Sequence, residues 1–218
     1  MSDTANDNRG FRAIRGVILD YGDVISHPAD PAVITEMASV FHLPLERFHQ
    51  LYGSLRLDYD RGTLTADEYW NRIAEAAGIE LSGQQTLDLR RMDVSMWSHL
   101  NQPVLRWTRA LRAAGLKTAI LSNMHDDMVQ HLRQDGAWTG NFDCLTLSSA
   151  IRVAKPDPEI FKHCLKCLRL EPHQALFVDD REQNVRAAEE LGIRGIVAPT
   201  TEQLRKQLVA IGFSPLPE

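Results

Sequence analysis

Short apolar runs alternate with helical patterns along much of this chain, and this alternation limits its fold more than any other feature. Four runs too brief for helices occupy residues 118–121, 144–147, 175–178 and 195–198, and an earlier one occupies residues 16–19. Helical patterns separate the later runs. Strands that alternate with helices form a parallel sheet with helices on both faces. The sequence therefore predicts an α/β protein with a three-layer, Rossmann-like core.

A different pattern fills residues 27–100, where no good strand is found. Apolar residues recur there at helical spacing, as at Tyr69 and Trp70. Thr65 followed by Glu68 matches a capping box, which predicts that a helix begins just after Thr65. We expect about four helices in this region, packed as a four-helix bundle that is inserted after the first strand.

These patterns predict the domain organisation. Residues 1–10 are polar and lack the apolar stretch of a secretory signal, so we expect a disordered tail. We expect residues 11–26 and 101–218 to form the core domain, and residues 27–100 to form the helical domain. No apolar run approaches the length of a membrane span, and we therefore expect a cytoplasmic protein.

Charge and cysteine content narrow the expected partners. The chain of 218 residues has a formal net charge of −5, and its Lys and Arg residues are scattered, which predicts neither a nucleic-acid nor a membrane partner. Cys144, Cys164 and Cys167 form an odd set without the spacing of a disulfide framework, as expected in a reducing compartment. Cys164 and Cys167 lie in a helical pattern, where we expect them to pack as small apolar residues.

Polar residues follow three of the predicted strands where each one ends. Asp20 follows the first strand, Ser122 and Asn123 follow the second, and Asp179 and Asp180 follow the fourth. The carboxyl ends of parallel strands line the crevice in which ligands bind, so we expect these groups to converge. Each pair of like charges about 4 Å apart costs roughly 4 kcal/mol at an effective dielectric of about 20, which a cation offsets. Ligands that are all oxygen favour Mg²⁺ over a transition metal.

A fourth polar motif begins at Lys155, after the strand at residues 144–147. Pro156 restricts Lys155 to an extended conformation, and Asp157 and Pro158 are typical of the first residues of a helix. This arrangement predicts a lysine held rigidly just before a helix. Taken alone, a lysine is usually a solvated surface residue and an Asp-Gly pair is common in ordinary turns, so the combination of motifs is what favours a site.

In this order, and with a helical insert after the first, the four motifs resemble those of the haloacid dehalogenase-like superfamily, in the branch with a helical cap. The resemblance extends from about residue 15 to about residue 208. More closely, residues 20–24, with the sequence Asp-Tyr-Gly-Asp-Val, are similar to the form found in bacterial sugar-phosphate phosphatase-like members, including glucose-1-phosphate phosphatases.

The resemblance implies a Mg²⁺-dependent phosphatase that acts on a small phosphorylated metabolite. Asp20 would be the catalytic nucleophile that forms an aspartyl-phosphate, and it would share Mg²⁺ with the substrate phosphate. Asp180 matches the direct metal ligand, and Gly22 matches the residue that lends a backbone carbonyl. Asp179 and Asn184 match supporting positions near the metal.

The same resemblance assigns residues to the phosphoryl group. Ser122, the Asn123 amide and Lys155 would hold the phosphoryl oxygens, so that Ser122 and Lys155 are also catalytic residues. Backbone N–H groups of Tyr21 and Gly22 would join them.

One position departs from the family pattern. Phosphatases of this superfamily usually carry a second aspartate two residues after the nucleophile, as general acid and base, but that position is Gly22 here. Loss of such a group typically costs about 10²- to 10⁴-fold in rate. Either the substrate has a good leaving group, or another residue substitutes. The candidates are His27 and Asp23, although strand alternation would direct Asp23 away from the site.

The helical insert should determine substrate choice, because it closes over the crevice. A polar cluster precedes the capping box and consists of Arg56, Tyr59, Asp60 and Arg61. These residues either face the substrate or form a solvated helix face. Trp97 lies in an apolar stripe, where we expect it in the core of the insert.

Two alternatives stay open at this point. One is a metal-independent 2-haloacid dehalogenase-type hydrolase, which uses the same aspartate on carbon, although the paired Asp179 and Asp180 argue against it. The other is a non-catalytic module that binds a phosphorylated ligand, for which Gly22 is the only indication. The sequence is compatible with a monomer or a homodimer.

Overall fold

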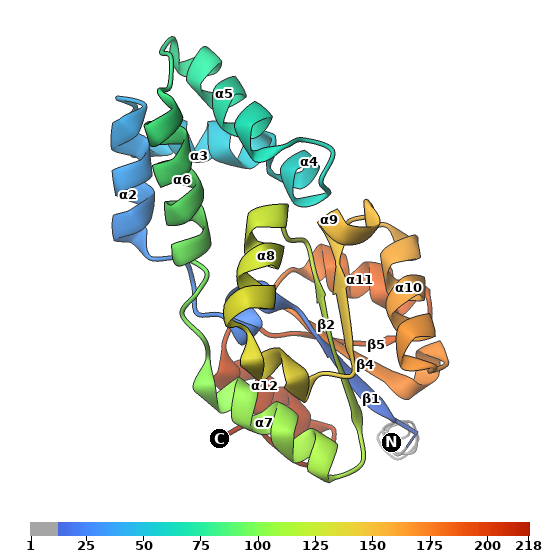
Figure 1. Cartoon of the computed structure of the whole chain (residues 1–218). Helices are drawn as coiled ribbons and strands as arrows, with labels where there is room; N and C mark the ends of the chain where they lie inside the picture. The colour runs from blue at the N-terminus through green and yellow to red at the C-terminus, as the bar shows by residue number, and fades with distance from the viewer. Residues whose placement is uncertain (1–12) are drawn as a thin grey trace, which may run out of the picture.

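A computed structural model describes residues 13–218, so the predicted tail at residues 1–10 lies outside the described residues. Five parallel strands form one sheet in the order β3-β2-β1-β4-β5 (Figure 1). They are β1 (Gly16–Leu19), β2 (Lys117–Ser122), β3 (Cys144–Leu147), β4 (Ala175–Asp179) and β5 (Arg194–Val197). All five lie where the sequence predicts strands, which confirms the α/β fold. Within the described part of the chain, no helix is both long enough and apolar enough to cross a membrane.

Helices cover both faces of the sheet (Figure 1). One face carries α7 (Gln102–Ala113), α8 (Asp126–Asp135) and α12 (Thr201–Ala210), and the other carries α10 (Pro158–Leu168) and α11 (Glu182–Glu190). Val17 and Leu19 belong to the apolar cluster of α7, whereas Ile18 between them belongs to that of α10. This alternation follows from the two-residue period of a strand, and it confirms the three-layer core. The remaining short elements are helical turns at Tyr21–Ile25, Ala137–Asn141 and Pro172–Gln174, and helix α9 (Ser148–Ile151).

Residues 27–100, which we call the cap segment, contain helices but no strand of the sheet. The helices are α2 (Pro31–Val40), α3 (Leu45–Ser54), α4 (Arg56–Asp60), α5 (Ala66–Ala77) and α6 (Gly83–Ser95), so the segment holds five helices rather than about four. The predicted capping box starts α5, with Thr65 and Glu68 bonded reciprocally. These helices enclose an apolar cluster of their own around Trp70. Ser26 and Leu100 form an antiparallel bridge, so the chain leaves and re-enters the sheet-containing part side by side. The division into two separately folding domains stays a prediction.

Two of the three cysteines do not follow the sequence expectation. Cys144 on β3 and Cys167 on α10 form a disulfide, with their Cα atoms 6.1 Å apart. The interpretation of the cysteines as unpaired thiols is wrong for these two. Helix α10 packs against β3, and this packing brings together two cysteines that are 23 positions apart in the sequence. Cys164 is a free, buried thiol in the apolar cluster of α10, as expected. Burial raises the pKa of this thiol to about 12, so it stays protonated at neutral pH.

An ion pair joins the cap segment to α8. Arg90 on α6 donates from Nε to one carboxylate oxygen of Asp127 at 2.8 Å and from Nη2 to the other at 2.7 Å. The two side chains are only 32% and 14% exposed, so solvent screens the pair incompletely. Two parallel charge-assisted bonds make this contact stronger than a typical surface ion pair.

We expect Arg90→Ala and Asp127→Asn each to lower the free energy of unfolding by about 1–2 kcal/mol, because each change leaves a partly buried charge without its partner. Urea denaturation of both single variants and the double variant measures this, and the cycle should give a coupling of about 1 kcal/mol. Arg91→Ala is the matched control, because Arg91 is 74% exposed and pairs with Asp88 on its own helix. Additive losses in the double variant would contradict the prediction.

Candidate active site

A cavity of about 280 Å³ lies at the carboxyl ends of β1, β2 and β4. One end, which we call the sheet end, is lined by residues of all four sequence motifs: Asp20, Ser122, Asn123, Lys155 and Asp180. The opposite end, which we call the cap end, is lined by residues of α3 and α4: Tyr52, Gly53, Arg56, Leu57 and Asp60. The structure therefore brings together the four polar motifs that the sequence predicts to converge. The cavity is small enough to suit a small molecule.

At the sheet end, a buried lysine lies between two carboxylates. The Lys155 Nζ atom is 2.8 Å from Asp20 Oδ1 and donates to Asp179 Oδ2 at 2.6 Å. Asp179 also accepts bonds from the Asn184 side-chain amide at 3.0 and 3.1 Å, and from the Arg181 backbone N–H at 2.8 Å. Asp179 is thus fixed on every side, and it fixes Lys155 in turn.

Electrostatics at the sheet end favour an additional cation. Burial raises the pKa of Asp20 to about 7, with Lys155 opposing this shift and Asp179 adding to it. Burial also raises the pKa of Asp180 to about 6, and repulsion from Asp179 contributes. Burial opposes protonation of Lys155, but Asp20 and Asp179 outweigh it and raise the Lys155 pKa. One lysine therefore leaves this group of carboxylates incompletely neutralised.

The carboxylates fit a magnesium ion. Asp20, Asp179 and Asp180 each offer one oxygen, and these oxygens lie within 4.8 Å of one another. Asn184 contributes a further sign of a missing partner, because its Oδ1 atom is buried and has no hydrogen-bond donor among the described residues. A set of donors that are all oxygen suits Mg²⁺, which would also relieve the repulsion among the acids.

The residues predicted to hold phosphate are present, but two of them are engaged with the protein. The Asn123 side chain accepts from the Lys155 backbone N–H at 2.7 Å and donates to its carbonyl at 2.9 Å, so this amide positions Lys155. The Tyr21 backbone N–H donates to Asp20 Oδ1 at 2.7 Å. The Ser122 hydroxyl makes only a long contact of 3.4 Å, to the Asn123 carbonyl. Ser122 and Lys155 both line the cavity, and Ser122 is the less engaged of the two because Lys155 is paired with Asp20 and Asp179.

Of the two candidate proton carriers, only Asp23 lines the cavity. The chain leaves the strand at Asp20 and forms a helical turn in which Asp23 has a φ of 58°. The expectation that strand alternation directs Asp23 away is wrong, because the left-handed conformation of Asp23 itself breaks the alternation. His27 is exposed and donates its backbone N–H to His99, and it does not line the cavity.

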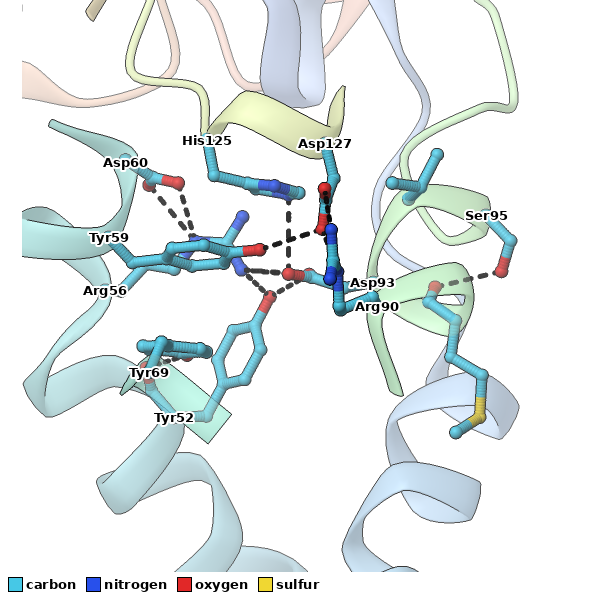
Figure 2. Close-up of polar contacts among 12 residues, drawn as sticks. Tyr52, Arg56, Tyr59, Asp60, Tyr69, Arg90, Asp93, Ser95, His125 and Asp127 are labelled. Carbon is cyan, nitrogen blue, oxygen red and sulfur yellow. Dashed lines mark hydrogen bonds and ion pairs between the residues drawn. The ribbon is translucent and has the colours of Figure 1, made fainter. Parts of the chain in front are cut away.

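The cap end is built around Arg56 (Figure 2). Arg56 donates from Nε to both oxygens of Asp60 at 2.9 and 3.1 Å, and from Nη1 to both oxygens of Asp93 at 2.9 and 3.0 Å. The Tyr52 hydroxyl accepts from Arg56 and donates to Asp93 at 2.6 Å. Burial raises the pKa of Asp60 to about 6, and Arg56 opposes this shift. Arg56 and Asp60, two of the four residues of the predicted polar cluster, are thus part of the cavity wall and not of a solvated helix face.

Tyr59 and Arg61 do not line the cavity. Tyr59 is buried behind the wall, where its ring stacks between Tyr69 at 4.3 Å and His125 at 4.5 Å. Trp97 packs against the apolar cluster of the cap segment, as expected, and it also lines the cavity. Which side chains face the cavity depends on how each helix is rotated about its own axis, and helical periodicity in the sequence does not give that rotation.

The sequence places His125 soon after Ser122 and Asn123, near enough to line the entrance of the site, and His125 does line the cavity. It immediately precedes α8, is 1% exposed and lies with Nε2 3.3 Å from Asp93 (Figure 2). Burial lowers the pKa of His125 to about 4, although Asp93 opposes this, so the ring is neutral at physiological pH. Neither ring nitrogen has a hydrogen-bond partner among the described residues. Its position two residues after the Ser122-Asn123 motif was the one available signal.

The sequence matches the family model of haloacid dehalogenase-like hydrolases over residues 9–192. It is 24% identical over 208 residues to a D-ribitol-5-phosphate phosphatase from Bacteroides thetaiotaomicron, which covers 91% of this chain and 98% of the relative. It is 36% identical over 223 residues to acyl-CoA dehydrogenase family member 10 from Mus musculus, which covers 95% of this chain but 20% of the relative. The chain spans 20% to 40% of the length of the first three curated relatives that it matches.

Solved structures share this fold. A haloacid dehalogenase family enzyme from Bacteroides thetaiotaomicron, in complex with magnesium and inorganic phosphate, superposes with a TM-score of 0.68 at 26% identity, covering 84% of this chain and 93% of that one. An L-2-haloacid dehalogenase from Xanthobacter autotrophicus superposes with a TM-score of 0.65 at 22% identity, covering 93% of this chain and 85% of that one. The second likeness concerns the fold alone.

Acid should destabilise the fold through His125. The unfolded chain protonates this residue below about pH 6.5 whereas the folded chain does so only near pH 4, so stability is lost as pH falls through that window. Between pH 7.5 and pH 5, we expect the wild type to lose about 1–2 kcal/mol more unfolding free energy than His125→Asn, as measured by urea denaturation. His49→Asn, at an exposed position on α3, should follow the wild type. If the unfolding free energy of His125→Asn and of the wild type fell equally with pH, His125 would not be the cause of the acid destabilisation.

Proposed function

Because the chain belongs to the haloacid dehalogenase-like hydrolases, we propose that it is a Mg²⁺-dependent phosphatase that hydrolyses the phosphate monoester of a small metabolite. The observation that carries the proposal is the cluster of Asp20, Asp179 and Asp180, in which Asp20 and Asp180 line one cavity together with Lys155 and Asp179 lies buried beside them. A phosphatase among the relatives, and a related structure that holds magnesium and phosphate, support it. A sugar phosphate or a polyol phosphate is the substrate class that these relatives suggest.

In the proposed reaction, an Asp20 oxygen attacks the phosphorus atom and the bond between phosphorus and the leaving oxygen breaks. This step forms an aspartyl-phosphate and releases the alcohol after it gains a proton. Water then attacks the phosphorus, which releases inorganic phosphate and regenerates the Asp20 carboxylate. Asp20 must be ionised to attack, and the 2.8 Å contact with Lys155 favours the ionised form.

The other residues hold the reacting groups in place. Asp20, Asp179 and Asp180 would hold Mg²⁺, with Gly22 lending its carbonyl and Asn184 supporting from nearby. The ion supplies positive charge that lets an anionic nucleophile approach an anionic phosphate. Ser122 and Lys155 would bind phosphoryl oxygens, while Asn123 keeps Lys155 in position. We expect the cap segment to exclude water during the reaction.

The two other hypotheses receive less support. Metal-independent hydrolysis of 2-haloacids would leave Asp179 and Asp180 beside the nucleophile without a cation that explains them. A non-catalytic ligand-binding role rests on Gly22 alone. Halide release from 2-chloropropionate would favour the first, and Mg²⁺-dependent phosphate binding without hydrolysis would favour the second.

We expect Mg²⁺ to support hydrolysis of p-nitrophenyl phosphate, and both excess EDTA and Asp20→Asn to reduce the rate by at least 10³-fold, because each removes an essential group. Release of p-nitrophenolate measures the rate. Asp88→Asn is the matched control, since that exposed carboxylate lies on α6 outside the cavity. Undiminished turnover in Asp20→Asn would refute the proposed nucleophile.

Gly22→Asp should restore the acid that the family usually places there. Gly22 has φ −61° and ψ 136°, which any residue adopts, and a Cβ atom would meet only the Trp97 ring, at 3.5 and 3.9 Å. An alkyl leaving group needs a proton and p-nitrophenolate does not, so we expect kcat/KM for glycerol phosphate to rise at least tenfold relative to p-nitrophenyl phosphate. Gly22→Asn controls for shape. If Gly22→Asp and Gly22→Asn changed this ratio of kcat/KM values equally, the introduced carboxylate would not be acting as a general acid.

A further inference from the structure

The cap end of the cavity is a fixed polar surface. Asp60 is 8% exposed, and its backbone carbonyl accepts a hydrogen bond from the Ser148 hydroxyl of α9. Its carboxylate is held by Arg56, whose side chain is 19% exposed. Both side chains line the same cavity as Asp20. A substrate bound at Asp20 therefore shares this cavity with Asp60 and Arg56.

The charge of this end is negative, although an arginine lies at its centre. Arg56 is paired with two carboxylates, Asp60 and the fully buried Asp93, so the three charges sum to −1. His125 adds no positive charge, because burial keeps it neutral. Of the other cations that line the cavity, Lys155 contacts Asp20, and Arg181 lies 4.0 Å from Asp180 and also acts to lower the pKa of Asp60. An additional anion at the cap end would thus meet a net negative surface.

The hydrogen-bonding groups of this end complement a hydroxyl group. Each Asp60 oxygen accepts one bond from Arg56 Nε and retains capacity to accept another. Arg56 bonds Asp60 through Nε, and Tyr52 and Asp93 through Nη1, and its guanidinium group carries further N–H donors. Hydroxyl groups both donate and accept, so they satisfy both partners. An apolar leaving group would displace water from Asp60 and Arg56 without replacing the hydrogen bonds to that water, which is unfavourable.

We propose that Asp60, held in place by Arg56, is a specificity-determining residue that accepts hydrogen bonds from hydroxyl groups of the leaving group and repels substrates with a second anionic group. The inference rests on the proposed phosphatase function and narrows it. The substrate class is the phosphate monoester of a neutral, polyhydroxylated alcohol, rather than a phosphorylated acid, a bisphosphate or an alkyl phosphate.

Three six-carbon esters test this inference, because they differ only in what they present to the cap end. Sorbitol 6-phosphate presents hydroxyl groups, 6-phosphogluconate replaces the terminal hydroxymethyl group by a carboxylate, and hexyl phosphate has no hydroxyl. With Mg²⁺, we expect the wild type to show kcat/KM values at least tenfold higher for sorbitol 6-phosphate than for the other two. In Asp60→Asn, which preserves the shape but removes the charge, the preference for sorbitol 6-phosphate over 6-phosphogluconate should fall at least tenfold.

Asp58→Asn is the matched control, because Asp58 lies on the same helix, pairs with Arg61 and does not line the cavity. It should keep the wild-type ratios. Equal rates for sorbitol 6-phosphate and 6-phosphogluconate in the wild type, faster hydrolysis of hexyl phosphate, or an unchanged ratio in Asp60→Asn would each overturn the inference. If Asp60→Asn does not fold, the kcat/KM values of the wild type for the three esters still test the proposed substrate class.

Failure of the phosphatase proposal gives a different result. If no ester is hydrolysed, p-nitrophenyl phosphate included, the proposed reaction is wrong, and calorimetric dissociation constants of the three esters replace the rates. The same order of preference, with the same loss in Asp60→Asn, would still support the role of Asp60. Absence of binding by all three would overturn it.

Discussion

The active-site region depends on one buried contact, in which Lys155 lies between Asp20 and Asp179. The three side chains come from segments far apart in the chain, and the ammonium group lies 2.8 and 2.6 Å from the two carboxylates. Burying such charges is costly unless they are paired with good geometry. The surrounding bonds supply that geometry, because Asn123 clamps the Lys155 backbone and Asn184 holds Asp179. The order of the parallel strands is what brings these segments to one edge.

The central fold could be predicted from the sequence because buried parallel strands leave a simple signature. Each strand is a short apolar run, and β1 ends at Leu19, directly before Asp20. Lys155 was recognisable because Pro156, Asp157 and Pro158 specify an extended residue before a helix, and Asp157 does cap α10. In both cases local backbone chemistry carries the information.

Other features needed the three-dimensional structure. Asp23 lines the cavity because of a backbone turn with positive φ, which no strand or helix pattern announces. The Cys144–Cys167 bond depends on how α10 packs on β3. Arg56 and Asp60 were identified as a polar cluster, but whether they faced the cavity or solvent depended on the rotation of α4. The metal set and the roles of the site residues stay proposals that the geometry supports.

Several contacts between the cap segment and the start of α8 are ion pairs and stacked rings, beside the apolar packing of Val94 and Trp97. Arg90 pairs with Asp127, His125 lies beside Asp93, and the Tyr59 ring rests on the His125 ring. When such surfaces part, water solvates the charged groups that had been paired. A seam in which part of the contact is polar would expose less aliphatic surface on opening than a seam that is wholly apolar. Entry of reactant and exit of product through this seam would then carry less risk of aggregation.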